Sequence, residues 1–266
     1  MLPVDSSPLD TVTTEAERIG RAAVDAGLQL RLMGGVAIWI TSPTVRRPPF
    51  ERAYGDFDLA VAKKDARRAA SFLEAAGYVP EKMFNALHGA TRLNFAHPDG
   101  RWPIDVVVDQ VAMSHTIDLR GRLGGRGMTL TLADLLLTKL QIWEINHKDL
   151  GDIVCLLADH ALADREDPET IDRRRIIDLA GGDWGLCHTM ERNLGRAIEE
   201  LGERTPAGAA HDPGVQARAL LDAIAIAPKS LSWKARARVG ELGARSPGRG
   251  AREDAVIRGD RSPRRS

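Results

Sequence analysis

The run Tyr54-Gly55-Asp56-Phe57-Asp58-Leu59-Ala60-Val61 decides the fold predicted for this chain. Its apolar residues Phe57, Leu59 and Val61 alternate with Asp56, Asp58 and Ala60, which is the period expected of a strand with one buried face. The opposite face then carries two carboxylates about 7 Å apart, because each strand residue rises roughly 3.3 Å. Like charges that close disturb each other's titration, so the pattern favours a site that holds cations.

Mixed helices and strands are expected on both sides of this run. A helix at 11–26 ends at Gly27, and the strand at 28–33 enters the glycine doublet Gly34-Gly35. The turn signal His97-Pro98-Asp99-Gly100 joins two further strands into a predicted hairpin. The remaining elements expected in this half are a helix at 36–40, a proline-rich loop at 41–51, a strand at 57–62, a helix at 64–76, and the hairpin strands at 93–97 and 104–109.

The second half of the chain has the spacing of helices only. Its predicted helices lie at 130–145, 150–162, about 168–180, 187–202 and 213–227. We therefore predict an α+β protein, in which a mixed sheet flanked by helices is followed by an α-helical C-terminal region. The predicted divisions are an α/β domain at 1–127, a helical domain at 128–242 and a basic tail at 243–266, whose composition predicts disorder.

Composition excludes several classes of protein. The chain has 266 residues with 37 basic and 37 acidic side chains, so its net charge attracts neither nucleic acid nor a membrane. Cys155 and Cys187 match no metal-binding spacing and are expected to be buried thiols. The N-terminus lacks a signal-peptide pattern, and no apolar run reaches the roughly 18 residues of a spanning helix. We therefore expect a cytoplasmic protein without a membrane partner.

A third acid completes the predicted site. Asp105 lies between Ile104 and Val106, so it points away from the apolar side of its strand. If that strand neighbours the strand of Asp56 and Asp58, three carboxylates meet on one sheet face. Two magnesium ions about 3.5–4 Å apart need this kind of donor set when they hold the oxygens of a phosphoryl transfer.

The glycine doublet suits the same chemistry. Glycine lets the backbone approach a phosphate closely, and a helix that begins after Gly34-Gly35 would point its N–H groups at that phosphate. Taken alone, such a doublet is typical of an ordinary turn. Its position before the Asp56-Phe57-Asp58 strand gives it weight.

The order of these residues resembles the DNA polymerase β-type nucleotidyltransferase superfamily, in which Gly-Gly is followed by Asp-x-Asp and by a lone Asp on a later strand. The chain is most similar to the small bacterial AbiEii-like nucleotidyltransferases. Arg52 stands four residues before the first aspartate, as in those relatives, whereas Tyr54 stands where a Ser or Thr is common. The helical runs around Thr138-Lys139-Leu140 and Lys148-Asp149 are also similar, and the resemblance covers roughly residues 15–200.

This resemblance implies a role for each matching residue. Asp56 and Asp58 would bind metal, and Asp105 would complete the metal site or activate the acceptor hydroxyl. The other implied residues are Gly34 and Gly35 for the triphosphate, Lys139 for a phosphate and Asp149 for orienting Lys139. Arg52 ends the proline- and arginine-rich loop at 43–52, where the alternatives are contact with substrate phosphate and a solvated loop. A buried lysine needs an anionic partner, so a structural salt bridge or a snorkelling side chain is the alternative role of Lys139.

The resulting hypothesis is a magnesium-dependent nucleotidyltransferase that uses an NTP as substrate. The acceptor would be a tRNA, a protein or a small molecule, and an antitoxin is an implied partner, because the similar proteins include toxins of toxin–antitoxin pairs. The first alternative is an inactive NTP-sensing or partner-binding module with the same fold. The second is a polar sheet face on which Arg or Lys caps the acids.

Overall fold

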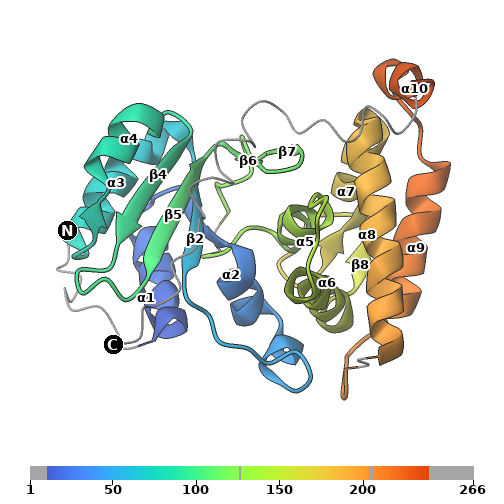
Figure 1. Ribbon diagram of the computed structural model, residues 1–266, viewed down its shortest axis with the longest axis horizontal. Helices are drawn as coiled ribbons and strands as arrows, with labels where there is room; N and C mark the ends of the chain where they lie inside the picture. Colours follow the sequence, from blue (N-terminus) through green and yellow to red (C-terminus); the bar gives the residue numbers. More distant parts are fainter. Residues whose placement is uncertain (1–10, 126, 204–205, 240–266) are drawn as a thin grey trace, which may run out of the picture.

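The computed structural model describes residues 11–125, 127–203 and 206–239, and the predicted tail at 243–266 lies outside these ranges. A five-stranded sheet forms the N-terminal half (Figure 1). Its strands are β1 (Leu30–Met33), β2 (Phe57–Val61), β3 (Val79–Pro80), β4 (Arg92–Ala96) and β5 (Pro103–Val108), in the spatial order β1-β2-β5-β4-β3. Strands β2 and β5 pair in parallel and the other neighbours pair antiparallel, so the sheet is mixed as predicted.

Local sequence explains most of the helices in this half. In α1 (Val12–Asp25), the Thr11 side chain accepts a hydrogen bond from the Thr14 backbone N–H, and Gly27 follows the helix with a φ of 64°. The other helical segments are α2 (Gly34–Thr41), the 3₁₀ turns η1 (Pro43–Arg46) and η2 (Lys63–Asp65), α3 (Ala66–Ala75) and α4 (Lys82–His88). The predicted loop at 41–51 therefore contains a short 3₁₀ turn.

The C-terminal half is helical, as predicted, apart from two short strand pairs. The hairpin of β6 (Gln110–Ala112) and β7 (Thr116–Asp118) leads out of the sheet, and β8 (Leu162–Ala163) pairs with β9 (Ile171–Asp172). The helices are α5 (Leu132–Leu140), α6 (His147–Asp159), α7 (Arg173–Gly182), α8 (Trp184–Glu203), α9 (Pro213–Ile226) and α10 (Leu231–Ala237).

The predicted helix at 130–145 is wrong at its C-terminal end. The helix stops at Leu140, and the chain turns before α6 begins behind its N-cap residue Asn146. The Asn146 side chain accepts a hydrogen bond from the Asp149 backbone N–H at 3.0 Å, which starts a new helix in a new direction. The apolar run therefore belongs to one helix and a turn. The elements α4, α10, β3, β6, β7, β8 and β9 were not predicted from the sequence either.

Helix α2 joins the two halves of the molecule. Figure 1 shows it between the sheet on one side and helices α5 to α9 on the other. It contacts β1 and β2 as well as α5 and α6, and its residues Val36, Ala37 and Ile38 are buried. These residues belong to one cluster of buried apolar side chains, so the sheet core and the helical core are continuous. No helix in the described ranges has the length and apolar character needed to cross a bilayer.

Candidate functional site

Strand pairing brings two of the three predicted acids side by side. β2 and β5 run parallel, and their register places Asp58 opposite Asp105. Neighbouring strands lie about 4.8 Å apart, so the two carboxylates are close neighbours although they are distant in sequence. Asp56 lies one residue before β2 and is exposed. The predicted neighbourhood of the two strands is thus confirmed.

Gly34 leaves open the space that the Asp58 carboxylate occupies. It is the first residue of α2 and has a φ of 71°, a conformation that residues other than glycine rarely adopt. A Cβ atom at Gly34 would lie 2.3 Å from Oδ2 of Asp58, far inside van der Waals contact. The carboxylate therefore rests against the start of α2, where backbone N–H groups favour an anion.

Gly35 makes a similar opening for the segment before β2. A Cβ atom there would lie 2.9 Å from Nη2 of Arg52 and 3.1 Å from Cε1 of Tyr54. The guanidinium of Arg52 also stands over the Tyr54 ring, 4.9 Å from its centroid. In this structure both glycines make room for side chains of the protein itself. Their predicted contact with a triphosphate remains a prediction.

The third acid already has a cationic partner that the sequence analysis missed. Both oxygens of Asp105 accept hydrogen bonds from Arg92 on β4, with Nε 2.7 Å from Oδ1 and Nη2 bonded to Oδ2. With its amide nitrogen turned toward Asp105, Asn94 donates to Oδ1 at 3.1 Å. The register of the β4–β5 hairpin is the signal that could have revealed this partner. It sets Asn94 opposite Asp105 and places Arg92 two residues along the strand on the same face.

This pairing bears on the predicted metal site. The carboxylates of Asp56, Asp58 and Asp105 have the chemistry that magnesium prefers. Within the described ranges, however, no group of three or more His, Cys, Asp and Glu side chains is arranged to hold a metal ion. The residues present therefore do not fit a three-carboxylate metal site as they stand. The alternative of acids capped by an arginine describes Asp105 well.

Lys139 lies in an ion-pair cluster beneath this region. Its Nζ is 2.6 Å from Oδ1 of Asp149 and 2.9 Å from Oδ2 of Asp152, and its side chain is 10% exposed. Arg52 reaches the same cluster, with Nη1 2.7 Å from Oδ1 of Asp152. The salt-bridge alternative for Lys139 is the arrangement that the structure contains. Asp149 contacts Lys139 directly, and the orienting role that the resemblance implied remains a prediction.

The charges of this cluster stabilise one another. Burial alone would lower the pKa of Lys139, but the nearby carboxylates of Asp152 and Asp149 outweigh it and raise that pKa. Burial also opposes the charge of Arg52, and the hydrogen bond and charge of Asp152 raise its pKa in the same way. Both cations are therefore charged at neutral pH. Asp152, which is fully buried, was not among the predicted site residues.

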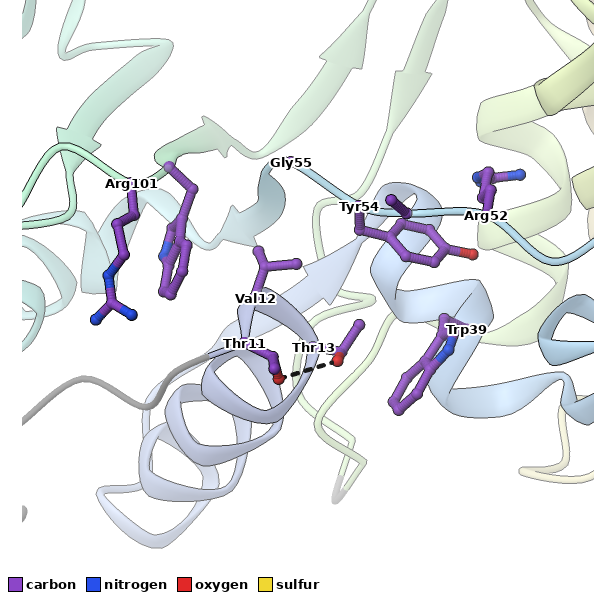
Figure 2. A pocket seen from close by; sticks show the side chains of 10 residues that line it. Thr11, Val12, Thr13, Trp39, Arg52, Tyr54, Gly55 and Arg101 are labelled. Atoms are coloured by element: carbon purple, nitrogen blue, oxygen red, sulfur yellow. Dashed lines mark hydrogen bonds between the residues drawn. The ribbon is translucent and has the colours of Figure 1, made fainter.

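A pocket of about 370 Å³ lies beside the segment 52–55, which precedes the acidic strand β2 (Figure 2). Figure 2 shows Arg101 on one side, Tyr54 and Trp39 on the other, and the first residues of α1 between them. Gly55, the residue before Asp56, also lines it. The complete lining is Thr11, Val12, Thr13, Trp39, Arg52, Ala53, Tyr54, Gly55, Arg101 and Trp102.

Each aromatic ring of the pocket has a guanidinium over it. Besides Arg52 over Tyr54, Arg46 lies 4.2 Å from the Trp39 ring centroid and Arg101 lies 4.8 Å from that of Trp102. Burial raises the pKa of Tyr54 to about 12, so its hydroxyl stays neutral. Aromatic faces and guanidinium planes are the groups on which unstacked nucleobases rest in proteins. The lining therefore suits a planar ring attached to a negatively charged group.

Comparison with known proteins gives a likeness of fold at a low score. No protein-family model matches the chain, and no curated protein matches it. Among solved structures, the crystal structure of JHP933 from Helicobacter pylori is similar over 87% of this chain and 94% of that chain. The two are 13% identical in sequence, and their TM-score is 0.35. A likeness at this level carries no functional argument.

Proposed function

We propose that this chain is a magnesium-dependent nucleotidyltransferase of the DNA polymerase β type, similar to the AbiEii-like enzymes. The observation that carries the proposal is the position of Asp58, which faces Asp105 across two parallel strands and rests against Gly34 at the start of α2. Paired acids next to a helix N-terminus can hold both the cation and the phosphates of a nucleotide.

The proposed reaction moves a nucleoside monophosphate from an NTP to an acceptor hydroxyl. The acceptor oxygen attacks the α-phosphorus, the bond to the bridging oxygen of the β-phosphate breaks, and pyrophosphate leaves. Magnesium, when bound, supplies the positive charge that balances the phosphate oxygens. The protein's own contribution is to position the two reactants and to stabilise the charge that develops between them.

Individual residues have distinct parts in this proposal. The N–H groups at the start of α2, at and after Gly34 and Gly35, would donate to the triphosphate. Asp56 and Asp58 would hold the cation, and Asp105 would accept a hydrogen bond from the acceptor hydroxyl, or its proton, through a lone pair that its pair with Arg92 leaves available. Lys139 acts indirectly. Together with Asp149 and Asp152 it fixes the position of Arg52, whose guanidinium lies next to Gly35.

The aromatic pocket supports a nucleotide as ligand. Three rings, each with a guanidinium over it, lie in the pocket beside the segment that leads to Asp56 and Asp58. Base stacking on such rings contributes about 1–3 kcal/mol per base and tolerates every base. This fits either the base of the NTP or a base of a nucleic-acid acceptor such as a tRNA. The net charge of zero gives a large RNA no long-range attraction.

One observation favours a second function, that of an NTP-sensing or partner-binding module without catalysis. Arg92 occupies both oxygens of Asp105, and a permanent guanidinium takes the place where a catalytic cation would be expected. In a module of this kind the helical half would serve as the interaction surface. An antitoxin would suit either function as a partner, and the acceptor could equally be a protein or a small molecule.

A measurement of turnover distinguishes the enzyme from the binding module. The full chain is incubated with each labelled NTP, Mg²⁺ and candidate acceptors, and both pyrophosphate release and label transfer are measured. We expect Asp58→Asn to lower turnover by roughly 10²–10³-fold, because it removes charge from the reacting centre. Asp25→Asn, at the exposed end of α1, is the control and should match wild type. If wild type and Asp58→Asn bind NTP equally and neither turns over, the binding module is the correct function.

A further inference from the structure

We propose that α10 docks on an anionic lipid surface, so that the protein binds membranes reversibly through the outer end of its helical half. The inference is independent of the proposed reaction. It departs from the sequence expectation of no membrane partner, which rested on a net charge of zero. That balance is a sum over the whole chain, whereas residues 223–239 contain four basic side chains and no acidic one. A local excess of one charge can bind a charged surface although the whole molecule is neutral.

Helix α10 is attached to the rest of the protein along one side. The backbone N–H of Ser230 donates to the carbonyl of Gly181, in the last turn of α7, at 2.9 Å. The Ser230 side chain caps α10 by accepting from the Trp233 backbone N–H at 3.1 Å. Trp233 is half-buried against the core, and Nζ of Lys229 lies 5.3 Å from its ring centroid. Figure 1 shows α10 at the outer end of the helical half, where it contacts α7 and α8.

The opposite side of α10 presents apolar side chains to solvent. With about 3.6 residues per turn, Leu231 and Ala235 lie on the side away from Trp233, and Val239 continues that stripe in the turn after the helix. Leu231 is 85% exposed and Val239 is 63% exposed. A surface helix normally turns its apolar stripe toward the core. Exposed apolar side chains gathered on one helix face therefore indicate an interaction site.

Cationic side chains flank this apolar stripe on both sides. Lys234 and Arg238 lie along one edge of the stripe and Arg236 along the other, and all three are exposed. Helices that lie in a bilayer interface combine apolar side chains that enter the acyl boundary with lysines and arginines at the anionic headgroups. The long cationic side chains can extend sideways to the headgroups while their apolar stems stay beside the stripe.

The combination of charge and apolar surface selects lipid as the partner. A nucleic-acid backbone would pair with the cations but would leave Leu231 and Val239 in water. A stable protein interface needs roughly 800 Å² on each side and an aromatic anchor, whereas α10 has seven residues and its Trp233 is turned toward the core. An anionic bilayer engages the cations and the apolar stripe together and requires no pocket.

Binding to vesicles tests the inference. The full chain is sedimented with vesicles of phosphatidylcholine alone and of phosphatidylcholine mixed with phosphatidylglycerol. We expect at least tenfold tighter binding to the anionic vesicles. Lys234→Gln combined with Arg238→Gln should weaken that binding at least tenfold, because each cation near an anionic surface contributes about fivefold. Leu231→Ser combined with Val239→Ser should weaken it about tenfold, because less apolar surface enters the bilayer.

Matched controls remove the same groups from other exposed positions. Lys64→Gln with Arg67→Gln removes the same charge from the sheet half, and Met83→Ser with Leu87→Ser removes apolar side chains that are 75% and 71% exposed on α4. Both controls should bind vesicles as wild type does, and circular dichroism checks the fold of every variant. The chain after residue 239 carries seven more arginines, so the variants assign the binding to α10. The inference is wrong if the α10 variants bind as wild type does, or if the controls lose as much.

A fluorescent label distinguishes lipid docking from the capture of any polyanion. Cys155 and Cys187 are buried, so a thiol-reactive nitrobenzoxadiazole label attaches to Leu231→Cys or to the control Leu87→Cys. We expect a blue shift of the emission at position 231 with anionic vesicles and none at position 87. Equal binding to neutral and anionic vesicles, or no binding at all, overturns the inference. Binding of a single-stranded oligonucleotide without any shift on vesicles would make nucleic acid the partner instead.

Discussion

At the scale of the residue, the site depends on the absence of one methyl group. Gly34 adopts a φ of 71°, and the space that its Cβ would fill is taken by Oδ2 of Asp58. A side chain at the first residue of α2 would therefore both strain the backbone and collide with the Asp58 carboxylate. Gly27 offers a comparison, because it has a φ of 64° but no atom of the described residues lies within 4 Å of where its Cβ would be.

Gly34→Ala should reduce both stability and turnover, whereas Gly27→Ala should reduce stability alone. Each substitution forces a side chain into the left-handed region, which costs roughly 1–2 kcal/mol. Only Gly34→Ala also displaces the Asp58 carboxylate, by a contact of 2.3 Å. Urea unfolding and pyrophosphate release measure the two effects. If Gly34→Ala turns over as fast as Gly27→Ala, the position of Asp58 against α2 does not matter for activity.

At the scale of the element, α5 and α6 are joined by their charges as well as by their apolar faces. Lys139, in the last turn of α5, reaches Asp149 and Asp152 in the first half of α6. Asn146 caps α6 and also donates to Oδ2 of Asp149 at 2.9 Å, so the cap positions the carboxylate that binds the lysine. The turn between the helices thus fixes the cluster that holds Arg52.

Lys139→Met should destabilise the protein by about 3–5 kcal/mol at neutral pH, because it leaves the half-buried Asp149 without its cation and the buried Asp152 with Arg52 alone. The exposed neighbour Lys148 is the control, and Lys148→Met should stay within about 0.5 kcal/mol of wild type. Urea unfolding of the three proteins measures the difference. A Lys139→Met protein as stable as Lys148→Met would show that the cluster contributes no net stability.

The same pair of variants predicts a dependence on pH. The folded protein raises the pKa of Lys139 above that of an unfolded lysine, about 10.4. The stabilisation is therefore fully present below pH of about 10 and is lost as the pH rises through the folded value. The stability gap between wild type and Lys139→Met should narrow in alkaline solution. A gap that widens there would contradict the charged pair.

At the scale of the whole molecule, polar contacts join the sheet half to the helical half along α2 and η1. The Thr44 hydroxyl and backbone N–H donate to Asp159 at 2.6 and 2.8 Å, and Arg52 reaches Asp152. The buried apolar residues of both halves form one core cluster. The two halves share one apolar core and are joined by hydrogen bonds and an ion pair. Such a protein is expected to unfold in a single transition.

Unfolding in urea should therefore give a single transition. Far-UV circular dichroism follows mainly the helices, and tryptophan fluorescence reports on both halves, since Trp39 and Trp102 lie in the first and Trp143 and Trp184 in the second. We expect the two signals to change together. Two separated transitions would show instead that the predicted divisions 1–127 and 128–242 fold independently.

Local sequence was enough to predict most of the longer elements and one pair of strands. The alternation from Phe57 to Val61, and the turn at 97–100, are short-range patterns that fix a strand and the β4–β5 hairpin. The position of Asp105 on the polar side of its strand follows from the same alternation. Such patterns depend on neighbours in the chain, so they can be deduced from the order of the residues.

Tertiary structure decided which charges meet. Lys139 is held by Asp149 and Asp152, and Arg92 by Asp105, through contacts that depend on strand register and on the turn before α6. The pocket is built from four separate segments of the chain. The order of the residues alone shows that acids, glycines and cations are present and which face of each element carries them. Only the packed fold decided which cation balances which acid, because ion pairing depends on distances of a few ångströms between residues far apart in the chain.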